Sequence, residues 1–237
     1  MARQILWRSI AETLSGEIAA GQYRPGDRLP TEADLAARFG VNRHTVRQAL
    51  ADLVGKGLVR TRRGAGAFVA SKPTDYPLSL RTRFHQNVLA SGRSPARRFT
   101  RLETRAADLR EAEALGLIPG AQVHVAEGVS LIDGQPVAVF RSVFPAERLP
   151  GLCAEITACQ SVTMALSACG VADYTRHSTR ITARIAEGTL ALALQLREGA
   201  AILRSDAVNV DAAGQPVEFG RTWFAGDRIT LTLSPES

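Results

Sequence analysis

The sequence predicts an α+β protein of two domains: a winged helix-turn-helix, then an antiparallel sheet with helices packed against it. Three observations lead to this fold class. Two short helices and a tight turn are predicted between residues 31 and 54, a Gly-rich hairpin follows them, and the rest of the chain contains a weak internal repeat. A chain of 237 residues is long enough for two domains. We expect the first domain at 1–72, a linker at 73–77 and the second domain at 78–237.

The basic charge of the chain is confined to its first part. Residues 1–72 hold 12 of the 29 Lys and Arg residues and 6 of the 23 Asp and Glu residues, so the whole excess of +6 lies there. Such an asymmetry indicates a polyanionic partner, for which nucleic acid is the first candidate. A solvated basic face without any partner is the alternative.

Three helices are predicted in this first part. An apolar residue at every fourth position forms the stripe of a first helix, which Gly21 ends. Thr31 is expected to cap the second helix and Asn42 the third, with Gly40 between them. The residues expected to point inward are Leu6, Ile10, Leu14 and Ile18, then Leu35, Ala36 and Phe39, then Val46, Ala49, Leu50, Leu53 and Val54.

The outer face of the third helix has the composition of a recognition helix. Arg43 and Arg47 are four residues apart and therefore lie on one side, away from Val46. Arg can bind guanine through two hydrogen bonds, and polar neighbours near the helix N-terminus can reach bases or phosphates. An ordinary solvated face is the alternative, but the helix-turn-helix spacing favours DNA.

A β-hairpin is predicted after the third helix. Two short strand-like runs flank the Gly-rich tip at 64–66. Arg62, Arg63 and Gly64 would suit a phosphate backbone or a narrow minor groove, where only small residues permit a close approach. This hairpin would be the wing.

The run from Pro25 to Val69 resembles the DNA-binding domain of the GntR family of bacterial transcription regulators. The resemblance implies binding to operator DNA. One recognition helix reads too few base pairs for genomic specificity, so we expect a homodimer on an inverted-repeat operator. The family often carries an Arg that touches DNA where this chain has Ala33, so that contact is lost or supplied elsewhere. The residues that the resemblance and the pattern place at DNA are Asn42, Arg43, His44, Thr45, Arg47, Arg62, Arg63 and Gly64.

The second part of the chain repeats itself weakly. The apolar and glycine positions between Ala112 and Val123 recur between Ala191 and Ile202, and the run Gly134–Val137 recurs as Gly214–Val217. Each copy predicts a short helix, a turn, a strand, a tight turn and another strand. Two such units would pair into one antiparallel sheet with pseudo-twofold symmetry. Chance similarity of two amphipathic units is the alternative.

This half resembles the effector domain of the HutC branch of the GntR family, which has a chorismate-lyase-like fold. The resemblance lies in residues 112–123, the hairpin 129–144, residues 145–149 and residues 226–228. Residues 75–87 and 42–45 are more specifically similar to the phosphonate-metabolism regulators of that branch. The resemblance implies a repressor that responds to a small ligand.

The resemblance also implies where the ligand binds. Relatives that sense amino-sugar phosphates carry Arg where this chain has Gly128 and Ser130, and Glu where it has Phe140, so a copy of their pocket is not expected. A phosphonate or related oxyanion is the first expectation, and a sugar phosphate or another small acid such as urocanate is the alternative. The expected effector contacts are Arg81, Thr82, Arg83, Phe84, Arg141, Ser161, Thr163, Arg180, Glu218 and Phe224.

Other classes of protein find little support in the sequence. It contains no paired-carboxylate motif, GxSxG, metal-ligand spacing or phosphate-binding Gly loop with a Lys, so we expect no catalytic residue, metal or cofactor. His85, His124 and His177 are isolated, and structural roles are expected for them. The three cysteines show no CxxC, which indicates reduced thiols and a cytoplasmic protein without a membrane span. A lyase-like enzyme and a ligand-free architectural DNA binder are the rival classes.

Overall fold

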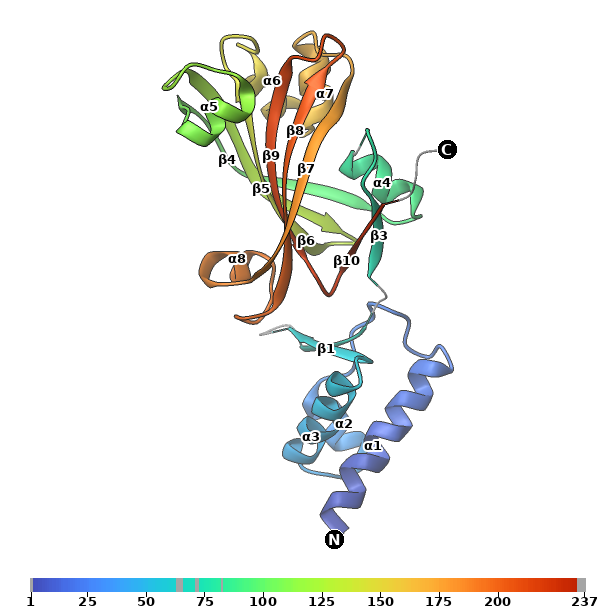
Figure 1. The fold of residues 1–237 in the computed structure, drawn as a ribbon. Helices are drawn as coiled ribbons and strands as arrows, with labels where there is room; N and C mark the ends of the chain where they lie inside the picture. The colour runs from blue at the N-terminus through green and yellow to red at the C-terminus, as the bar shows by residue number, and fades with distance from the viewer. Residues whose placement is uncertain (1, 63–65, 71–72, 82, 234–237) are drawn as a thin grey trace. The chain divides into compact units, whose positions relative to one another are not determined.

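The computed structural model describes residues 2–62, 66–70, 73–81 and 83–233, and the chain divides into two compact units, Met1–Lys72 and Pro73–Ser237 (Figure 1). The first unit contains three helices and a two-stranded antiparallel hairpin, as expected for a winged helix-turn-helix. Its elements are α1 (Ala2–Ala19), α2 (Glu32–Phe39), α3 (Arg43–Gly55), β1 (Val59–Arg62) and β2 (Gly66–Val69).

The helix boundaries of the first unit follow from local capping. The Thr31 side chain accepts a hydrogen bond from the Asp34 N–H, and the Asp34 carboxylate accepts one from the Thr31 N–H, which forms a capping box. Gly40 ends α2 in the left-handed region with φ 63°. Asn42 caps α3 by accepting from the Thr45 N–H at 2.9 Å. The predicted caps are therefore confirmed.

The core of the first unit is formed by the predicted apolar stripes, with two exceptions. Leu14, Leu35 and Leu53 are fully buried in one cluster. Leu6 and Val54, which were expected to point inward, are 45% and 39% exposed. Leu6 lies near the start of α1 and Val54 in the last turn of α3.

The second unit is built on a six-stranded antiparallel sheet in the order β4-β5-β6-β9-β8-β7. Its strands are β3 (Thr74–Pro77), β4 (Pro95–Ala106), β5 (Gln122–Ile132), β6 (Gln135–Pro145), β7 (Tyr174–Ile185), β8 (Ala201–Asp211), β9 (Pro216–Ala225) and β10 (Ile229–Thr232). Its helices are α4 (Phe84–Ala90), α5 (Leu109–Leu115), α6 (Leu152–Cys159), α7 (Val162–Ala168) and α8 (Gly188–Ala193).

The strand order confirms the predicted repeat and extends it. β4, α5 and β5 recur later in the chain as β7, α8 and β8, and the two halves meet where β6 pairs with β9. The predicted repeat began at Ala112 and so did not include β4 and β7, although Arg97, Arg101 and Arg105 recur at the same offset as Arg176, Arg180 and Arg184. Each of these outer strands contains a β-bulge, between Phe99 and Arg101 in β4 and between Arg176 and Ser178 in β7.

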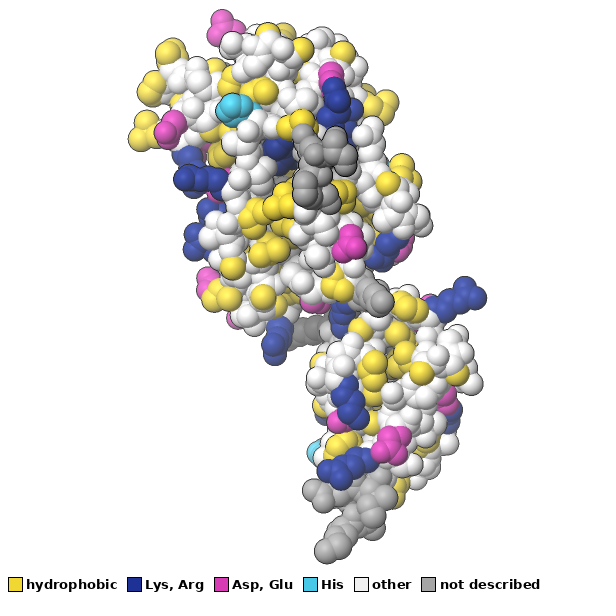
Figure 2. All heavy atoms as spheres, turned by 45° about the vertical axis from the view of Figure 1, so that its right-hand side comes forward, with side chains coloured by type: hydrophobic (Ala, Val, Ile, Leu, Met, Phe, Trp, Pro, Cys, Tyr) yellow, Lys and Arg dark blue, Asp and Glu magenta, His cyan; other side chains and the backbone are white. Residues whose placement is uncertain are grey.

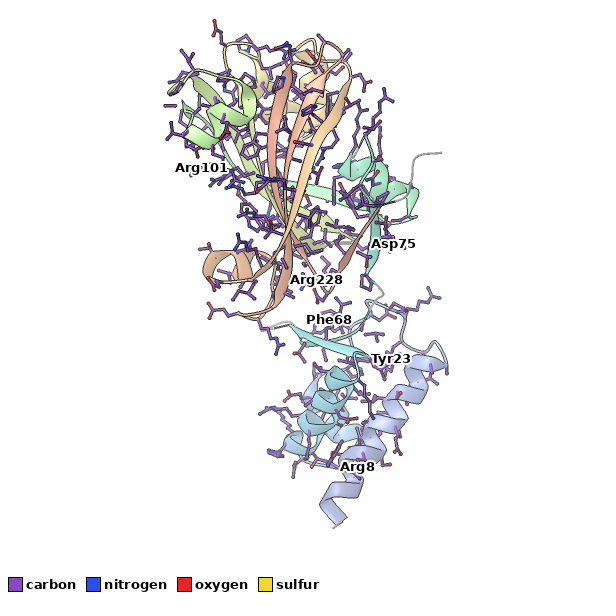
Figure 3. All side chains as sticks on the ribbon, viewed as in Figure 1. Arg8, Tyr23, Phe68, Asp75, Arg101 and Arg228 are labelled. Carbon is purple, nitrogen blue, oxygen red and sulfur yellow. The ribbon has the colours of Figure 1, made fainter. Side chains whose placement is uncertain are left out.

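The two faces of the sheet are covered differently. One face carries α5 at one end and α8 at the other, each packed in its own apolar cluster (Figure 1). Between them a row of charged residues crosses all six strands in register, beginning at Arg101 (Figure 3). The row consists of Arg101, Glu127, Arg141, Arg221, Asp206 and Arg180.

The opposite face of the sheet packs against α4, α6 and α7 and against the short strands β3 and β10. α6 and α7 cover one part of it, in a cluster around Phe144. α4, β3 and β10 cover another part, in a cluster around Tyr76 and Phe224. The segment 73–77 was expected to be a linker, but β3 within it pairs in parallel with β10 and belongs to the second unit. The two prolines and the turn-forming residues of this segment are typical of a linker, and the sequence therefore did not predict this strand.

Among the described residues, no helix is long and apolar enough to cross a membrane.

Candidate ligand pocket and nucleic-acid interface

The N-terminal half of α3 presents polar side chains to solvent. Asn42, Arg43, His44 and Arg47 are exposed, and Val46 and Ala49 are buried on the opposite side. Thr45 differs from the others, because it is only 5% exposed and its hydroxyl donates to Asn42 Oδ1 at 3.0 Å. Four of the five residues expected on this helix surface therefore project from it, and Thr45 supports the helix N-terminus.

Arg47 is held by a residue from the preceding helix. Its Nε and Nη2 donate to the two carboxylate oxygens of Glu32, at 3.3 and 2.9 Å. The hydrogen bond and charge of Arg47 lower the pKa of Glu32 below its usual value, despite the opposing effect of burial. Both side chains remain largely accessible, so this pair fixes the direction of Arg47 along the helix surface. Ala33, the position of the missing family Arg, is exposed beside Glu32.

The wing is described only in part. Arg62 is the last residue of β1, whereas Arg63 and Gly64 lie outside the described residues. On the face of the first unit shown in Figure 2, acidic side chains accompany the basic ones. The positive excess of this unit is thus not a continuous basic patch on that face.

A cavity of about 600 Å³ lies on the face of the six-stranded sheet that α4, α6 and α7 cover. Strands from both halves of the repeat line it, together with residues of β3, α4 and α7. Apolar rings, hydroxyl groups and amides share its wall with three arginines and one carboxylate. The residues that matter most for ligand chemistry are Tyr76, Arg83, Phe84, Arg97, Phe140, Ser142, Tyr174, Arg176, Asn209 and Glu218.

Six of the expected effector contacts line this cavity: Arg83, Phe84, Ser161, Thr163, Glu218 and Phe224. Two of them also have structural partners. Ser161 caps α7, its side chain accepting from the Met164 N–H at 3.3 Å, and Thr163 Oγ1 lies 2.9 Å from the Tyr174 hydroxyl.

Three other expected contacts do not line the cavity. Arg81 is exposed and pairs with Asp173 at 2.5 Å. Arg141 pairs with Glu127 within the charged row on the opposite face, and Arg180 belongs to the same row. Thr82 lies outside the described residues. Contrary to expectation, the structure does not bring Arg81, Arg141 and Arg180 to this cavity, and the strand register places the last two on the opposite face of the sheet.

Two arginines that sequence reasoning missed do line the cavity. Arg97 on β4 pairs in register with Ser130, and Arg176 on β7 pairs with Asn209. The offset in sequence from Arg97 to Arg176 equals that from Ser130 to Asn209, so the two pairs occupy equivalent positions in the two repeats. Extending the repeat back to Arg97 would have found this pair.

In the part of the chain that the structure describes, the guanidinium groups of Arg97 and Arg176 lack charged partners. Arg97 lies over the Phe140 ring at 4.8 Å and the Phe84 ring at 5.5 Å, and no carboxylate pairs with it in the described part of the chain. The Arg176 guanidinium makes only a 3.5 Å contact with Thr179 Oγ1 there. In Arg97, Arg176 and Arg83 the Nε atom is buried without a hydrogen-bond partner among the described residues. Such buried donors are rare unless a ligand or water satisfies them.

The carboxylate in the cavity is held by neutral donors. Ser142 Oγ donates to Glu218 Oε1 at 2.5 Å, and Asn209 Nδ2 donates to Oε2 at 2.6 Å. All three residues are buried. Among the described residues, no Arg, Lys or His forms an ion pair with Glu218.

Two tyrosines and a histidine complete the polar wall. Burial raises the pKa of Tyr76 to about 12 and also raises that of Tyr174, so both phenols are neutral and can donate hydrogen bonds. Burial and the charge of Arg97 lower the pKa of His85. His85 was expected to be structural but lines the cavity, whereas His124 has the expected structural role between Thr104 and the Leu149 carbonyl.

Two family models match the chain. The UTRA domain model matches residues 90–230, which is more than half of the chain, and the model of the gntR family of bacterial regulatory proteins matches residues 6–69. The chain belongs to the GntR family. The UTRA match lies within the second unit, which is called the UTRA domain below. The match contains the cavity-lining residues from Ala96 to Phe224, whereas those from Tyr76 to Gln86 precede it.

Similar proteins cover nearly the whole chain of this GntR-family regulator. An uncharacterized HTH-type transcriptional regulator of Rhizobium meliloti is 42% identical, over 96% of this chain and 94% of its own. The probable transcriptional regulator PhnF of Escherichia coli is 32% identical, over 96% and 94%. The crystal structure of PhnF from Mycobacterium smegmatis superposes with a TM-score of 0.66 at 28% identity, over 96% and 99%. These names are those of regulators and not of enzymes.

Proposed function

We propose that this GntR-family regulator is a homodimeric repressor whose UTRA domain binds a small anion carrying a phosphonate or phosphate group. Binding of the anion changes the affinity for an inverted-repeat operator. The observation that carries the proposal is the pair Arg97 and Arg176, which face one cavity from equivalent strands with buried, unpartnered Nε donors in the part of the chain that the structure describes.

The chemistry of the cavity supports an anion. Arg presents planar donors in a fork that matches a phosphonate or carboxylate, and it binds them more strongly when water is excluded. Arg83 adds a third guanidinium, although one of its nitrogens also binds Asp173 at 2.7 Å. Three cations in one cavity with a single buried carboxylate favour a ligand with negative charge over an uncharged one. The similarity to regulators named PhnF makes phosphonates the first class to test.

The exposed polar face of α3 supports the DNA-binding half of the proposal. Arg43 and Arg47 project from the face opposite to the buried Val46, as base contacts from a recognition helix would require. One such helix reads too few base pairs for genomic specificity, and a twofold dimer doubles the contacts. Arg62, with Arg63 and Gly64, would contact the phosphate backbone from the wing.

A route for coupling follows from the chain order. β3 begins two residues after the first unit ends, and its Tyr76 lines the cavity. A ligand that contacts Tyr76 would therefore act on the segment that joins the two units. The ligand can change operator affinity only if it binds two arrangements of the dimer with different affinities. A coupling free energy of about 1–3 kcal/mol between ligand binding and DNA binding is usual.

The experiment is calorimetric titration of the full chain with methylphosphonate, phosphate, an amino-sugar phosphate and urocanate. Methylphosphonate or phosphate is expected to bind, and Arg97→Ala and Arg176→Ala are each expected to weaken binding at least about tenfold. Arg184→Ala is the matched control, because it removes an exposed arginine of β7 that does not line the cavity. Tight binding of urocanate alone would contradict this assignment, and so would anion binding that persists in a variant that carries both Arg97→Ala and Arg176→Ala.

The DNA-binding half is tested by operator titration at several salt concentrations. If about 6–10 phosphates are neutralised, the logarithm of affinity is expected to fall against the logarithm of salt with a slope of about −5 to −9. Two chains are expected per palindromic operator. A salt-independent affinity or one chain per palindrome would refute the model.

A further inference from the structure

The two halves of the UTRA sheet differ at one position of the cavity wall. In the first half, Arg97 pairs with Ser130, which pairs with Ala138. In the second half, the equivalent row runs from Arg176 through Asn209 to Glu218. The repeat thus places a methyl group on one side of the cavity and a carboxylate at the equivalent point on the other.

The Glu218 carboxylate retains hydrogen-bonding capacity. A carboxylate has about four acceptor sites, and the donors Ser142 and Asn209 use one on each oxygen. Both donors are neutral, so they orient the group without cancelling its charge. A buried carboxylate without a cationic partner is costly, and a ligand cation in the cavity would remove that cost.

The arginines of the cavity do not supply this cation themselves. By strand register Arg176 lies two strands from Glu218, about 10 Å between backbones, and no ion pair joins their side chains. The Arg97 guanidinium lies over the Phe140 ring and within 5.5 Å of the centre of the Phe84 ring. The cavity therefore presents separate groups for an anion and for a cation.

We propose that the effector is a zwitterion, in which the arginines bind the phosphonate or phosphate and Glu218 binds a protonated amine. This inference rests on the anion site proposed above and specifies its ligand class. An ω-aminoalkylphosphonate has the required chemistry. A neutral hydroxyl in place of the amine would donate a hydrogen bond to Glu218 but would not neutralise its charge.

The test compares matched ligands by calorimetry on the full-length protein. The amine series is aminomethyl-, 2-aminoethyl- and 3-aminopropylphosphonate, and each is paired with methyl-, ethyl- or propylphosphonate. One chain length is expected to show a preference for the amine of at least about tenfold, as for hydrogen bonds to charged groups. The hydroxyalkylphosphonate of the same chain length is expected to bind at most a few-fold more tightly than the alkyl compound.

Glu218→Gln is expected to abolish the amine preference and to leave alkylphosphonate binding unchanged or tighter, because a negative charge beside the anion is lost. Glu127→Gln is the control, since this carboxylate lies on the same sheet in the charged row of the opposite face. It should keep the amine preference.

The outcomes separate the two proposals. Equal binding of amine and alkyl compounds at all three lengths, or an amine preference that persists in Glu218→Gln, overturns the zwitterion and leaves the anion site intact. If neither the phosphonates nor phosphate bind, both proposals fail; if phosphate alone binds, only the zwitterion fails. Tighter binding of the hydroxyl compound than of the amine would mean that Glu218 accepts from a neutral donor rather than from an ammonium group. That result would also overturn the inference.

Discussion

Arg97 and Arg176 come from different halves of the sequence repeat, yet the pseudo-twofold axis of the sheet brings both guanidinium groups to one cavity. Neither has a carboxylate partner among the described residues. Like charges facing one cavity without counterions destabilise the ligand-free domain and favour an anionic ligand. Binding and stability should therefore respond in opposite directions when one of these charges is removed.

Arg176→Met tests this opposition. The variant is expected to raise the free energy of unfolding of the ligand-free protein by up to about 1 kcal/mol, because a buried unpaired donor is removed. It should also lose the stabilisation that a phosphonate gives the wild type. Urea unfolding with and without ligand measures both effects, and Arg184→Met should change neither. A loss of stability without ligand would show that Arg176 has a structural role.

The recognition face is tested by Arg43→Ala. Loss of a base contact is expected to weaken specific binding by about 1–3 kcal/mol, and non-specific binding much less. Arg24→Ala removes the same charge from an exposed turn of the same unit and serves as the control. Fluorescence anisotropy with operator and scrambled DNA measures the difference. Unchanged operator affinity in Arg43→Ala would mean that this face of α3 does not read bases.

The core of the UTRA domain should depend strongly on Phe144. This ring is fully buried beneath α6 and α7. Phe144→Ala is expected to lower the free energy of unfolding by about 3–5 kcal/mol, through lost burial and the resulting cavity. Leu192→Ala, at a position 79% exposed, should change it by less than about 0.5 kcal/mol. Chemical denaturation monitored by circular dichroism measures both; comparable losses would mean that the cluster around Phe144 is not the core.

Asp206 should make stability depend on pH. Burial alone would raise the pKa of Asp206, but the hydrogen bond from Arg221 and the charges of Arg221, Arg204 and Arg110 outweigh it and lower the pKa. A lowered pKa in the folded state means that the stabilisation is present above the unfolded value of about 3.9 and is lost as pH falls through the folded value.

We therefore expect Asp206→Asn to be less stable than the wild type at pH 7, by about 1.5–3 kcal/mol, because three arginines lose their charged partner. The difference should shrink as the pH is lowered from 4 toward 3. Asp75→Asn, at an exposed carboxylate on β3 (Figure 3), is the control. Denaturant midpoints measured across this range would contradict the prediction if the difference stayed constant.

The sequence alone determined the features that depend on neighbouring residues. Thr31 and Asn42 cap helices through hydrogen bonds to residues three positions away, and Gly40 supplies the left-handed turn between them. The helix-turn-helix was predictable because these contacts are local. The repeat that begins at Ala112 and again at Ala191 was also readable, and it was sufficient to predict one antiparallel sheet built from two similar halves.

The tertiary structure decided which arginines face the cavity. Arg97 and Arg101 have the same parity along β4, as do Arg176 and Arg180 along β7, so simple alternation would place each pair on one face. The bulges between Phe99 and Arg101 and between Arg176 and Ser178 reverse the alternation, and the second arginine of each pair joins the charged row instead. A β-bulge depends on pairing with a distant strand, and residue type alone does not encode where the extra residue falls.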